Sequence, residues 1–321
     1  MRHGVLSFIC ILAALAAVTS CGRGVSSTDT IRIASLRGPS SIAMIRLIDS
    51  LASNDKVQME VQIYEEPQQL RECMLEGIVD FAVLPSTMAS LLYNKGVDYR
   101  AVAVPLWGSL FLCGTDDSVR CLEDLKGRTV CLMAKGMTPD VLFRYLLKAH
   151  GIELYRDVQL DYRFQTHIAL ANAAIAGRAP LCVLAEPYMS QALRANSDLH
   201  LLINLNAEWE RTEASPEAET LLLCRGDIAD RRDSVISKVV DAYAASANWV
   251  VAHPDSAASL SVKHGINPDS AAVYMSIPRS NIRVVSSRVA GDFITEYLAA
   301  FYSMSPEIIG GKMPDEKFIF K

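Results

Sequence analysis

The segment Thr129–Asp140 reads TVCLMAKGMTPD and predicts a strand, a loop and a helix start in direct succession. Val130–Ala134 is a short apolar run typical of a strand, Lys135 and Gly136 make a basic loop, and Thr138 is a residue type that caps helices. Because the first N–H groups of a helix lack partners within the helix, such a unit can hold an anion. The loop lacks the GxxxxGK pattern, so it is not a nucleotide-binding P-loop.

The same pattern occurs earlier in the chain. Ile31–Ser41 reads IRIASLRGPSS, which again places a basic residue and a glycine between a strand and a proline at a helix start. Arg37 and Gly38 thus take the place of Lys135 and Gly136. The repetition indicates that the chain contains two related units.

Each unit continues in the same order. An amphipathic helix follows, then a second strand (Val57–Tyr64 and Val158–Phe164), a short helix, and a third strand (Gly77–Ser86 and Gly177–Pro187). This alternation predicts an α/β fold with two lobes, each with a β-α-β-α-β core. Ligands of open parallel sheets bind beyond the carboxyl ends of the strands, so two lobes with facing strand ends enclose a cleft.

The lobes are expected to be discontinuous in sequence. We assign residues 30–108 and 220–321 to lobe I and residues 109–219 to lobe II, because a strand at Thr220–Cys224 would return the chain to the first lobe. Two crossings of this kind make a hinge. Three further local predictions are a helix at Ile42–Leu51, a polar loop at Asn206–Glu219, and C-terminal helices that form an outer layer on lobe I.

The N-terminus predicts export rather than fold. Residues 1–20 combine Arg2 with a short apolar run, as signal peptides do. Val18–Cys21 then matches the bacterial lipobox, in which the cysteine acquires acyl chains such as palmitate and becomes the mature N-terminus. The polar residues 21–29 would be a tether. An ordinary secretory signal with a coincidental cysteine is the alternative. We therefore expect a lipid anchor on Cys21 and a location at the cell membrane, facing the periplasm or the cell exterior.

Composition argues against several function classes. The chain of 321 residues has a net charge of −5 and no basic tract, which argues against nucleic acid. It contains no GxSxG, HExxH or GxGxxG signature, so we predict no catalytic residue and no cofactor. The cysteines form no CxxC or Cys/His cluster, which predicts no metal site. Cys113 and Cys121 could pair in an oxidising compartment, but their spacing leaves this open.

Predicted strand ends and helix starts supply the candidate ligand contacts. These are Arg37, Gly38, Ser40, Ser41, Pro85, Ser86, Thr87, Trp107, Lys135, Gly136, Thr138 and Glu186. Most have a structural alternative, namely a solvated loop charge for Arg37 and Lys135, a helix cap for Ser40, Ser41, Thr138 and Glu186, and a core position for Trp107.

The charges indicate the kind of ligand. Arg37 and Lys135 both lie next to helix starts, which favours a ligand with an anionic or strongly electronegative group. Glu186, at another strand end, would suit an amine or a hydroxyl on the same molecule. A small anionic or zwitterionic organic solute is therefore expected.

The motifs together resemble those of a known family. The lipobox combines with IRIASLRGPSSIAMIRL, GIVDFAVLPSTMASLL, CLEDLKGRTVCLMAKGMTPDVLFRYLLKAHGI and VLAEPYMSQAL. This combination resembles the nitrate/sulfonate/taurine-type solute-binding proteins of ABC importers, which include binders of thiamine-pyrimidine precursors. The likeness covers essentially the whole mature chain. It implies a type II periplasmic-binding fold and delivery of a solute to an ABC permease and its ATPase, and we expect a monomer.

The resemblance also implies where a ligand binds. It places the family's sites at Gly38–Ser41, Pro85–Thr87 and Lys135–Thr138. Family members bind different ligands, so the identity of the solute is not implied. The thiamine-pyrimidine synthase branch of this fold needs a cysteine-rich motif, whereas the cysteines here are dispersed. Two other functions fit the same scaffold: an enzyme, or a tethered sensor that reports a ligand without transport.

Overall fold

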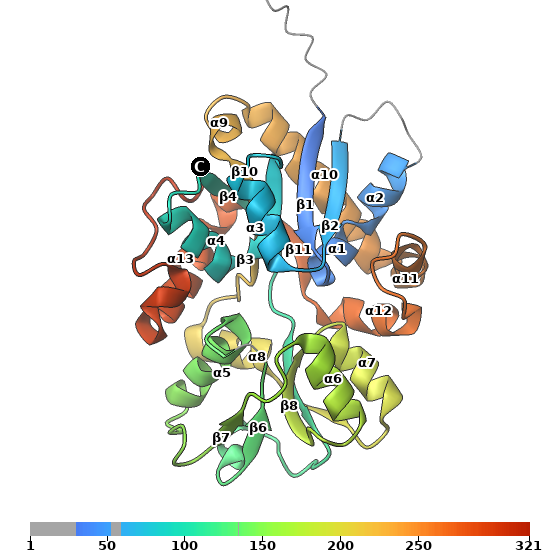
Figure 1. Ribbon diagram of the computed structural model, residues 1–321, viewed down its shortest axis with the longest axis vertical. Coiled ribbons are helices and arrows are strands. Elements are labelled where there is room, and N and C mark those ends of the chain that lie inside the picture. Colours follow the sequence, from blue (N-terminus) through green and yellow to red (C-terminus); the bar gives the residue numbers. More distant parts are fainter. Residues whose placement is uncertain (1–29, 53–58, 134) are drawn as a thin grey trace, which may run out of the picture. The chain divides into compact units, whose positions relative to one another are not determined.

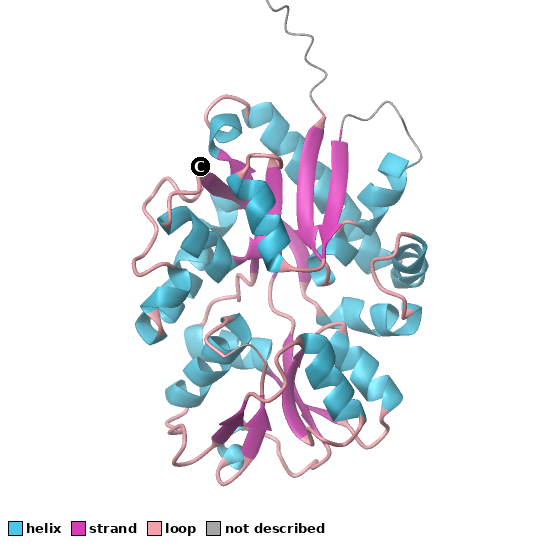
Figure 2. Cartoon of the chain, viewed as in Figure 1, coloured by secondary structure: helices cyan, strands magenta, loops and turns pink. Residues whose placement is uncertain are grey.

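The computed structural model describes residues 30–52, 59–133 and 135–321. The predicted signal peptide, Cys21 and the tether lie outside these residues. Ile31–Lys321 form one compact unit that contains two β-sheets with helices around each (Figures 1 and 2). This arrangement confirms the predicted α/β fold with two lobes.

Six strands form the first sheet, in the order β11-β4-β10-β3-β1-β2. Strand β1 is parallel to β2 and β3, whereas β10 lies antiparallel between β3 and β4. The predicted strand at Val57–Tyr64 corresponds to β2, although residues 57 and 58 lie outside the described part. The strands are β1 Ile31–Leu36, β2 Met59–Tyr64, β3 Phe81–Pro85, β4 Tyr99–Leu106, β10 Thr220–Arg225 and β11 Ile282–Ser286.

Helices cover both faces of the first sheet (Figure 2). In β3, Ala82 and Leu84 pack in a cluster with α3, α4 and α13, whereas Phe81 and Val83 pack with α1, α2 and α10. A strand buried on both faces reads as a continuous apolar run, which is why β3 was recognisable in the sequence. The helices are α1 Pro39–Ala43, α2 Ile45–Ala52, α3 Pro67–Leu75, α4 Ser86–Asn94, α9 Gly226–Ala229, α10 Asp233–Ala252, α11 Pro254–Lys263, α12 Ser270–Ser276 and α13 Ser287–Met304.

Five strands form the second sheet, in the order β7-β6-β8-β5-β9. Strand β6 is parallel to β7 and β8, and β5 lies antiparallel between β8 and β9. The first sheet repeats this plan in β2-β1-β3-β10-β4, as the repeated motif predicts. The strands are β5 Leu110–Gly114, β6 Thr129–Cys131, β7 Gln159–Asp161, β8 Leu181–Ala185 and β9 His200–Asn204.

The second sheet is also covered on both faces. Helices α5 (Thr138–Ala149) and α8 (Leu205–Glu213) contribute to the core on one face, and α6 (His167–Ile175) and α7 (Tyr188–Ala195) to the core on the other. All strands between residues 110 and 204 belong to this sheet, and those before and after belong to the first. The lobe boundaries at 108/109 and 219/220 stay a prediction.

Two local predictions differ from the structure. The helix predicted at Ile42–Leu51 begins earlier and is broken at Met44, whose N–H donates to the carbonyl oxygen of Ser41 (3.1 Å) and so closes a tighter turn. The strand predicted at Val158–Phe164 is shorter, because only Gln159–Asp161 pair with β6. Beyond its end, the hydroxyl of Tyr162 donates to Asp140 (2.5 Å).

The predicted polar loop at Asn206–Glu219 is wrong for its first part, which forms helix α8. The side-chain oxygen of Asn204 accepts the N–H groups of Asn206 (3.0 Å) and Ala207 (3.3 Å) and thereby caps the helix. Trp209 anchors the same helix, since only 1% of its surface is exposed. The segment is mostly polar, but it contains one large side chain, Trp209, that is buried and fixes the helix.

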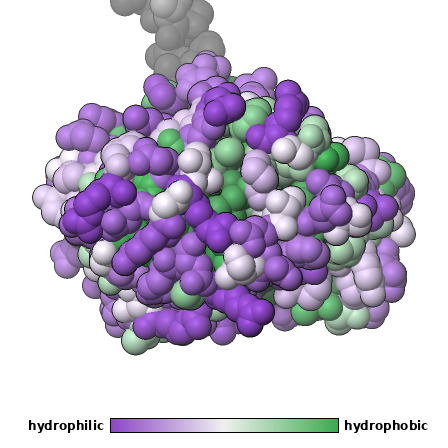
Figure 3. Space-filling view, turned by 90° about the horizontal axis from the view of Figure 1, so that it is seen from below, coloured by the Kyte–Doolittle hydropathy of each residue, from purple (hydrophilic) through white to green (hydrophobic). Residues whose placement is uncertain are grey.

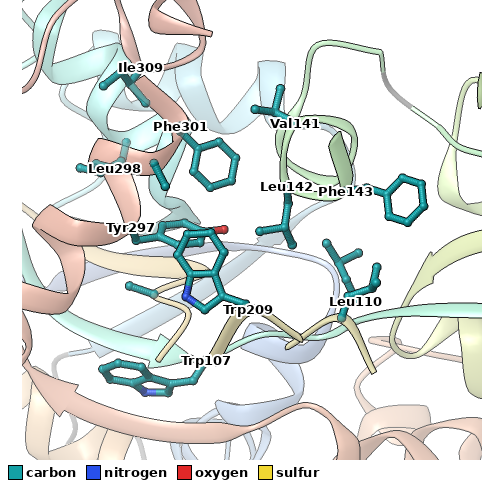
Figure 4. Packing of buried hydrophobic residues seen from close by; sticks show 14 of the residues in the cluster. Trp107, Leu110, Val141, Leu142, Phe143, Trp209, Tyr297, Leu298, Phe301 and Ile309 are labelled. Carbon is teal, nitrogen blue, oxygen red and sulfur yellow. The ribbon is translucent and has the colours of Figure 1, made fainter. Parts of the chain in front are cut away.

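The C-terminal helices do more than cover lobe I, so that prediction is incomplete. Helix α13 contacts α5 and helix α12 contacts α7, and both α5 and α7 belong to the second lobe. Figure 4 shows Tyr297 beside Trp209, and Phe301 on the side of α13 that faces Val141 and Leu142. The ring centroids of Trp209 and Tyr297 are 5.1 Å apart in an edge-to-face arrangement. Aromatic packing therefore joins the two lobes.

The two chain crossings between the lobes lie against each other. Gly108, in the first crossing, has a φ of +101°, and a Cβ there would lie 2.4 Å from Oδ1 of Asn206 and 2.8 Å from Oε2 of Glu217. Both the conformation and the close approach therefore require glycine. Ser109 donates a hydrogen bond to Oε1 of Glu219 (2.9 Å), which ties the first crossing to the second.

The surface differs from this interior. Hydrophilic side chains cover most of the face seen in Figure 3, and apolar ones show between them as small patches. Among the described residues, no helix combines the length and the apolar character that a membrane crossing requires.

We expect Asn204→Ala to destabilise the protein by about 0.5–2 kcal/mol, because α8 loses its N-terminal hydrogen bonds. Asn204→Asp is the matched control, since it keeps an oxygen acceptor at the same place and should retain most of the stability. Urea unfolding of the three proteins measures the difference. Equal stability of Asn204→Ala and the wild type would contradict the capping role of Asn204.

Candidate functional site

A cavity of about 450 Å³ lies where the strand ends of the two sheets meet. Its wall contains residues that follow β1, β3, β6 and β8. Six helices begin at this wall, namely α1, α3, α4, α5, α6 and α7. The cavity therefore occupies the position where ligands of open α/β sheets bind.

The cavity wall includes part of the predicted contact set: Arg37, Gly38, Ser40, Pro85, Thr87, Thr138 and Glu186. The hydroxyls of Thr87 and Thr138 form a buried hydrogen bond of 2.7 Å that joins the start of α4 to the start of α5. Thr138 makes no capping bond within its own helix. Ser40 likewise bonds the hydroxyl of Thr220 (3.2 Å) instead of capping α1.

The structure does not bring Ser41 and Ser86 to the cavity. The hydroxyl of Ser41 donates to the carbonyl oxygen of Gly38 (2.8 Å) and accepts its N–H (3.0 Å). The hydroxyl of Ser86 donates to the carbonyl oxygen of Ala218. Both side chains are fully buried and hold the backbone behind the cavity wall.

Trp107 belongs to the core instead of the cavity wall. Only 3% of its surface is exposed, and its indole N–H donates to the carbonyl oxygen of Arg283 (2.6 Å). Its ring packs edge-on against Phe293 with centroids 5.9 Å apart. Figure 4 shows it below the other packed aromatic side chains. Trp107 therefore has the core position that the sequence left open as the alternative to a ligand contact.

The cavity wall does not include Lys135 or Gly136 either. The Lys135 ammonium lies 5.5 Å from the centroid of the Tyr162 ring, on an exposed turn. The N–H of Gly136 donates to the carboxylate of Asp140 (2.7 Å). Asp140, in the first turn of α5, therefore already accepts the N–H group of Gly136 that an anionic ligand would need.

Arg37 lines the cavity, but its guanidinium is engaged. Its Nε donates to Oε2 of Glu65 (2.8 Å), and its Nη1 donates to the carbonyl oxygens of Gly265 and Ile266. The ion pair neutralises much of the positive charge that Arg37 would offer to a ligand. Arg37 also ties the loop after β1 to the end of α11.

Glu186 lines the cavity and also caps a helix. Its two carboxylate oxygens accept the N–H (3.1 Å) and the hydroxyl (2.9 Å) of Ser190 in the first turn of α7. Arg279 lies 3.7 Å away. Burial raises the pKa of Glu186, and these partners act against that shift.

Glu219 is a cavity carboxyl in the second crossing that the sequence does not predict, because its segment reads as a polar loop. Its Oε1 accepts the Ser109 hydroxyl, and its Oε2 is buried without a hydrogen-bond partner among the described residues. Burial raises its pKa from 4.5 to about 7. Glu217 lies two residues away, fully buried, and burial together with the charge of Glu219 raises its pKa well above the usual value. This pair keeps a proton near neutral pH.

His167 was also missed, because a lone histidine at a helix start carries no distinctive sequence signal. It lines the cavity at the first residue of α6, and its ring stacks on Tyr188 with centroids 5.4 Å apart and an interplanar angle of 2°. Burial lowers its pKa to about 4, so the ring is neutral at pH 7. Its Nδ1 is buried without a hydrogen-bond partner among the described residues.

The rest of the wall mixes acidic, amide and apolar side chains. The further members that bear on ligand chemistry are Glu65, Glu66, Met88, Met133, Met137, Gln165, Thr166 and Ile168. The cavity thus combines helix starts and hydroxyls with several carboxyls and a flexible apolar lining.

Comparison with known proteins agrees with this geometry. The model of the family "ABC transporter, phosphonate, periplasmic substrate-binding protein" matches residues 41–221, more than half of the chain. A search of curated proteins finds no match.

Several solved structures share the fold. The crystal structure of an ABC transporter protein from Parabacteroides distasonis is 27% identical, with 91% of this chain and 99% of that chain covered and a TM-score of 0.78. The aliphatic sulphonate binding protein SsuA from Escherichia coli is 16% identical, with 92% of each chain covered and a TM-score of 0.73. The nitrate-binding protein NrtA from Synechocystis PCC 6803 is 14% identical, with 88% and 84% covered and a TM-score of 0.59.

The resemblance seen in the sequence motifs is thereby confirmed, and these structures share the two-lobe fold. The chain belongs to the family of phosphonate-type periplasmic substrate-binding proteins and is the non-enzymatic, solute-binding component of an ABC importer.

Proposed function

We propose that the cavity captures a small organic solute that carries an anionic group and a hydrogen-bond donor, and that the two lobes close around it. The observation that carries this proposal is the buried hydrogen bond between Thr87 and Thr138, which spans the cavity from one lobe to the other. A contact of this kind exists only in a closed form, so it favours closure when a ligand fills the space between the lobes. The chain crossings at residues 107–109 and 214–219 act as the hinge.

The helix starts at the cavity wall supply the anion-binding end. Each start lies at the wall of the same cavity, so the positive ends of several helix dipoles converge there. The printed names of similar proteins, a sulphonate binder and a nitrate binder, and of the family, with its phosphonate, all specify oxyanions. Because Lys135 lies outside the wall and Arg37 is paired, we assign the anion to backbone N–H groups and to the hydroxyls of Ser40, Thr87 and Thr138.

The carboxyls supply the other end. Oε2 of Glu219 is a buried acceptor without a partner among the described residues, and an amine or hydroxyl of the ligand would satisfy it. Glu186, which the sequence suggested for this role, already has Ser190 as its partner. A volume of about 450 Å³ lies in the range of about 300–1,000 Å³ typical of organic ligand sites. The solute is therefore organic and zwitterionic rather than a bare inorganic ion.

The importer context concerns the whole protein. As a family member, the chain delivers its solute to an ABC permease and ATPase. We further propose that it is a monomer tethered by a lipid on Cys21, because Val18–Cys21 matches a lipobox. The lipid would hold the receptor close to its permease.

Thr87→Val and Thr138→Val should each weaken binding about two- to tenfold, because each removes a hydrogen bond worth roughly 0.5–1.5 kcal/mol from the closed form. The double variant should lose less affinity than the sum of the two single losses, since both changes remove the same bond between Thr87 and Thr138. Native mass spectrometry of the purified protein, followed by denaturation, identifies the solute, and calorimetric titration measures its affinity.

Thr129→Val is the matched control, because Thr129 is an exposed threonine at the start of β6, far along the same strand–loop–helix unit. Its affinity should equal that of the wild type. Additive losses in the double variant would show that Thr87 and Thr138 act independently. A released solute without an anionic group would refute the proposed ligand class itself.

The raised pKa of Glu219 predicts a pH dependence of stability. The folded state holds the proton of Glu219 up to about pH 7, whereas the unfolded state releases it near pH 4.5. Stability of the ligand-free protein should therefore fall as pH rises from about 4.5 to about 7 and change little from this source above that range. Glu219→Gln, which stays neutral, should be more stable than the wild type at pH 8 by roughly 1–3 kcal/mol.

Urea unfolding at a series of pH values measures this effect. Glu66→Gln is the control, because Glu66 also lines the cavity but is exposed, so its removal should leave the pH slope unchanged. The raised pKa of Glu217 also makes stability fall as pH rises. The pH dependence of stability in Glu219→Gln should therefore be weaker than in the wild type but still present. A slope identical to that of the wild type would contradict the assignment.

Cys21→Ser should yield an exported protein that no longer partitions into detergent, because serine cannot accept the lipid thioether. Phase separation of whole-cell extracts measures the partition, and Cys73→Ser serves as a cysteine control that keeps the anchor. Recovery of Cys21→Ser in the detergent phase would refute the lipid anchor.

A further inference from the structure

Three cysteines lie side by side across the second sheet. Cys131 of β6 pairs with Cys182 of β8, and Cys182 pairs with Cys113 of β5 on its other side. All three side chains belong to the apolar cluster under α6 and α7. Cys113 and Cys182 are fully buried, and their sulfur atoms are 3.5 Å apart.

We propose that Cys113 and Cys182 form a disulfide bond in the exported protein. The two residues are directly opposite on neighbouring antiparallel strands. Opposite residues in such strands have Cα atoms about 4.5 or 5.5 Å apart, and both values lie within the range of about 4.4–6.8 Å that disulfides span. Rotation of the side chains can therefore close the bond without displacing either strand.

The geometry selects this pair over the alternatives. Cys121, the partner that the sequence left open for Cys113, is exposed on a turn and makes its contacts with Asp124. Cys131 lies next to Cys182 on a parallel strand, but the sulfur-to-sulfur contact that the structure shows joins Cys182 to Cys113. Among the described residues, no group of three or more His, Cys, Asp or Glu side chains is placed to hold a metal ion.

The compartment supplies the chemistry. The protein belongs to a periplasmic family, and disulfides persist in that compartment. Each thiol loses one proton and one electron as the new S–S bond forms. An exchange oxidant that carries its own disulfide takes up the two electrons and the two protons, and its disulfide is reduced to a dithiol. Contact with Cys113 and burial raise the pKa of the Cys182 thiol, so the exchange takes place while the strands are still accessible during folding.

The bond would fix the two central strands of the second lobe to each other. Their opposite ends, Leu110 and Ala185, pair with each other and line the cavity. The cysteines are 69 positions apart in the sequence, so the bond closes a long loop and limits the freedom of the unfolded chain. It would stabilise the second lobe without touching the ligand.

Differential alkylation tests the proposal. The full-length protein is isolated from its exported location, denatured in the presence of one alkylating reagent, then reduced and treated with an isotopically different one. Peptide mapping should find Cys113 and Cys182 labelled only after reduction, and Cys131 labelled before it. Free thiols at Cys113 and Cys182, or a bond between Cys131 and Cys182, would overturn the proposal.

Thermal unfolding provides a second readout. Reductant should lower the unfolding midpoint of the wild type by several degrees and leave that of Cys113→Ala unchanged. Cys131→Ala is the matched control, because it removes a buried cysteine from the same face of the same sheet and should keep the response to reductant. A wild-type midpoint that does not respond to reductant would also overturn the proposal.

Discussion

The two lobes depend on a contact between the two chain segments that connect them. Gly108 of the first segment lies so close to Asn206 and Glu217 that a Cβ at this position would collide with both side chains. Ser109 bonds Glu219 across the same contact. The segments therefore run together through a buried region that contains two carboxyls, and burial of these groups favours their protonated form. Close backbone approach and buried polar groups together set the path of the chain between the lobes.

That path explains why the sheets have the same plan although their strands come from different parts of the sequence. The first strand after each crossing joins a sheet antiparallel to its neighbours, β5 in the second sheet and β10 in the first. The insertion places the start of β5 and the start of β10 next to the ends of β8 and β3. Strand ends, helix starts and the connecting segments then surround one cavity. The position of the cavity thus follows from where the chain crosses between the lobes.

Local pattern predicts those cavity-lining residues whose position depends on the backbone. Ser40, Thr87 and Thr138 were predicted because a hydroxyl follows a strand end, and all three line the cavity. Lys135 fits the same pattern but does not line the cavity, because Gly136 beside it is bonded to Asp140 and the turn faces solvent. Glu219 and His167 escaped notice, because their significance comes from burial and from the neighbours that folding brings to them.

The sequence by itself determined the α/β class, the repeated strand–loop–helix unit and the division into two lobes, because strand and helix periodicity and glycine or proline positions are local properties. Only the tertiary structure decided which charges face the cavity. Arg37 is neutralised by Glu65, and Glu186 is bound to Ser190. Among the described residues that line the cavity, Glu219 has a buried carboxylate oxygen without a partner, in a segment that reads as a polar loop. Pairing of charges and burial of carboxyls arise between residues distant in sequence, so no local pattern contains them.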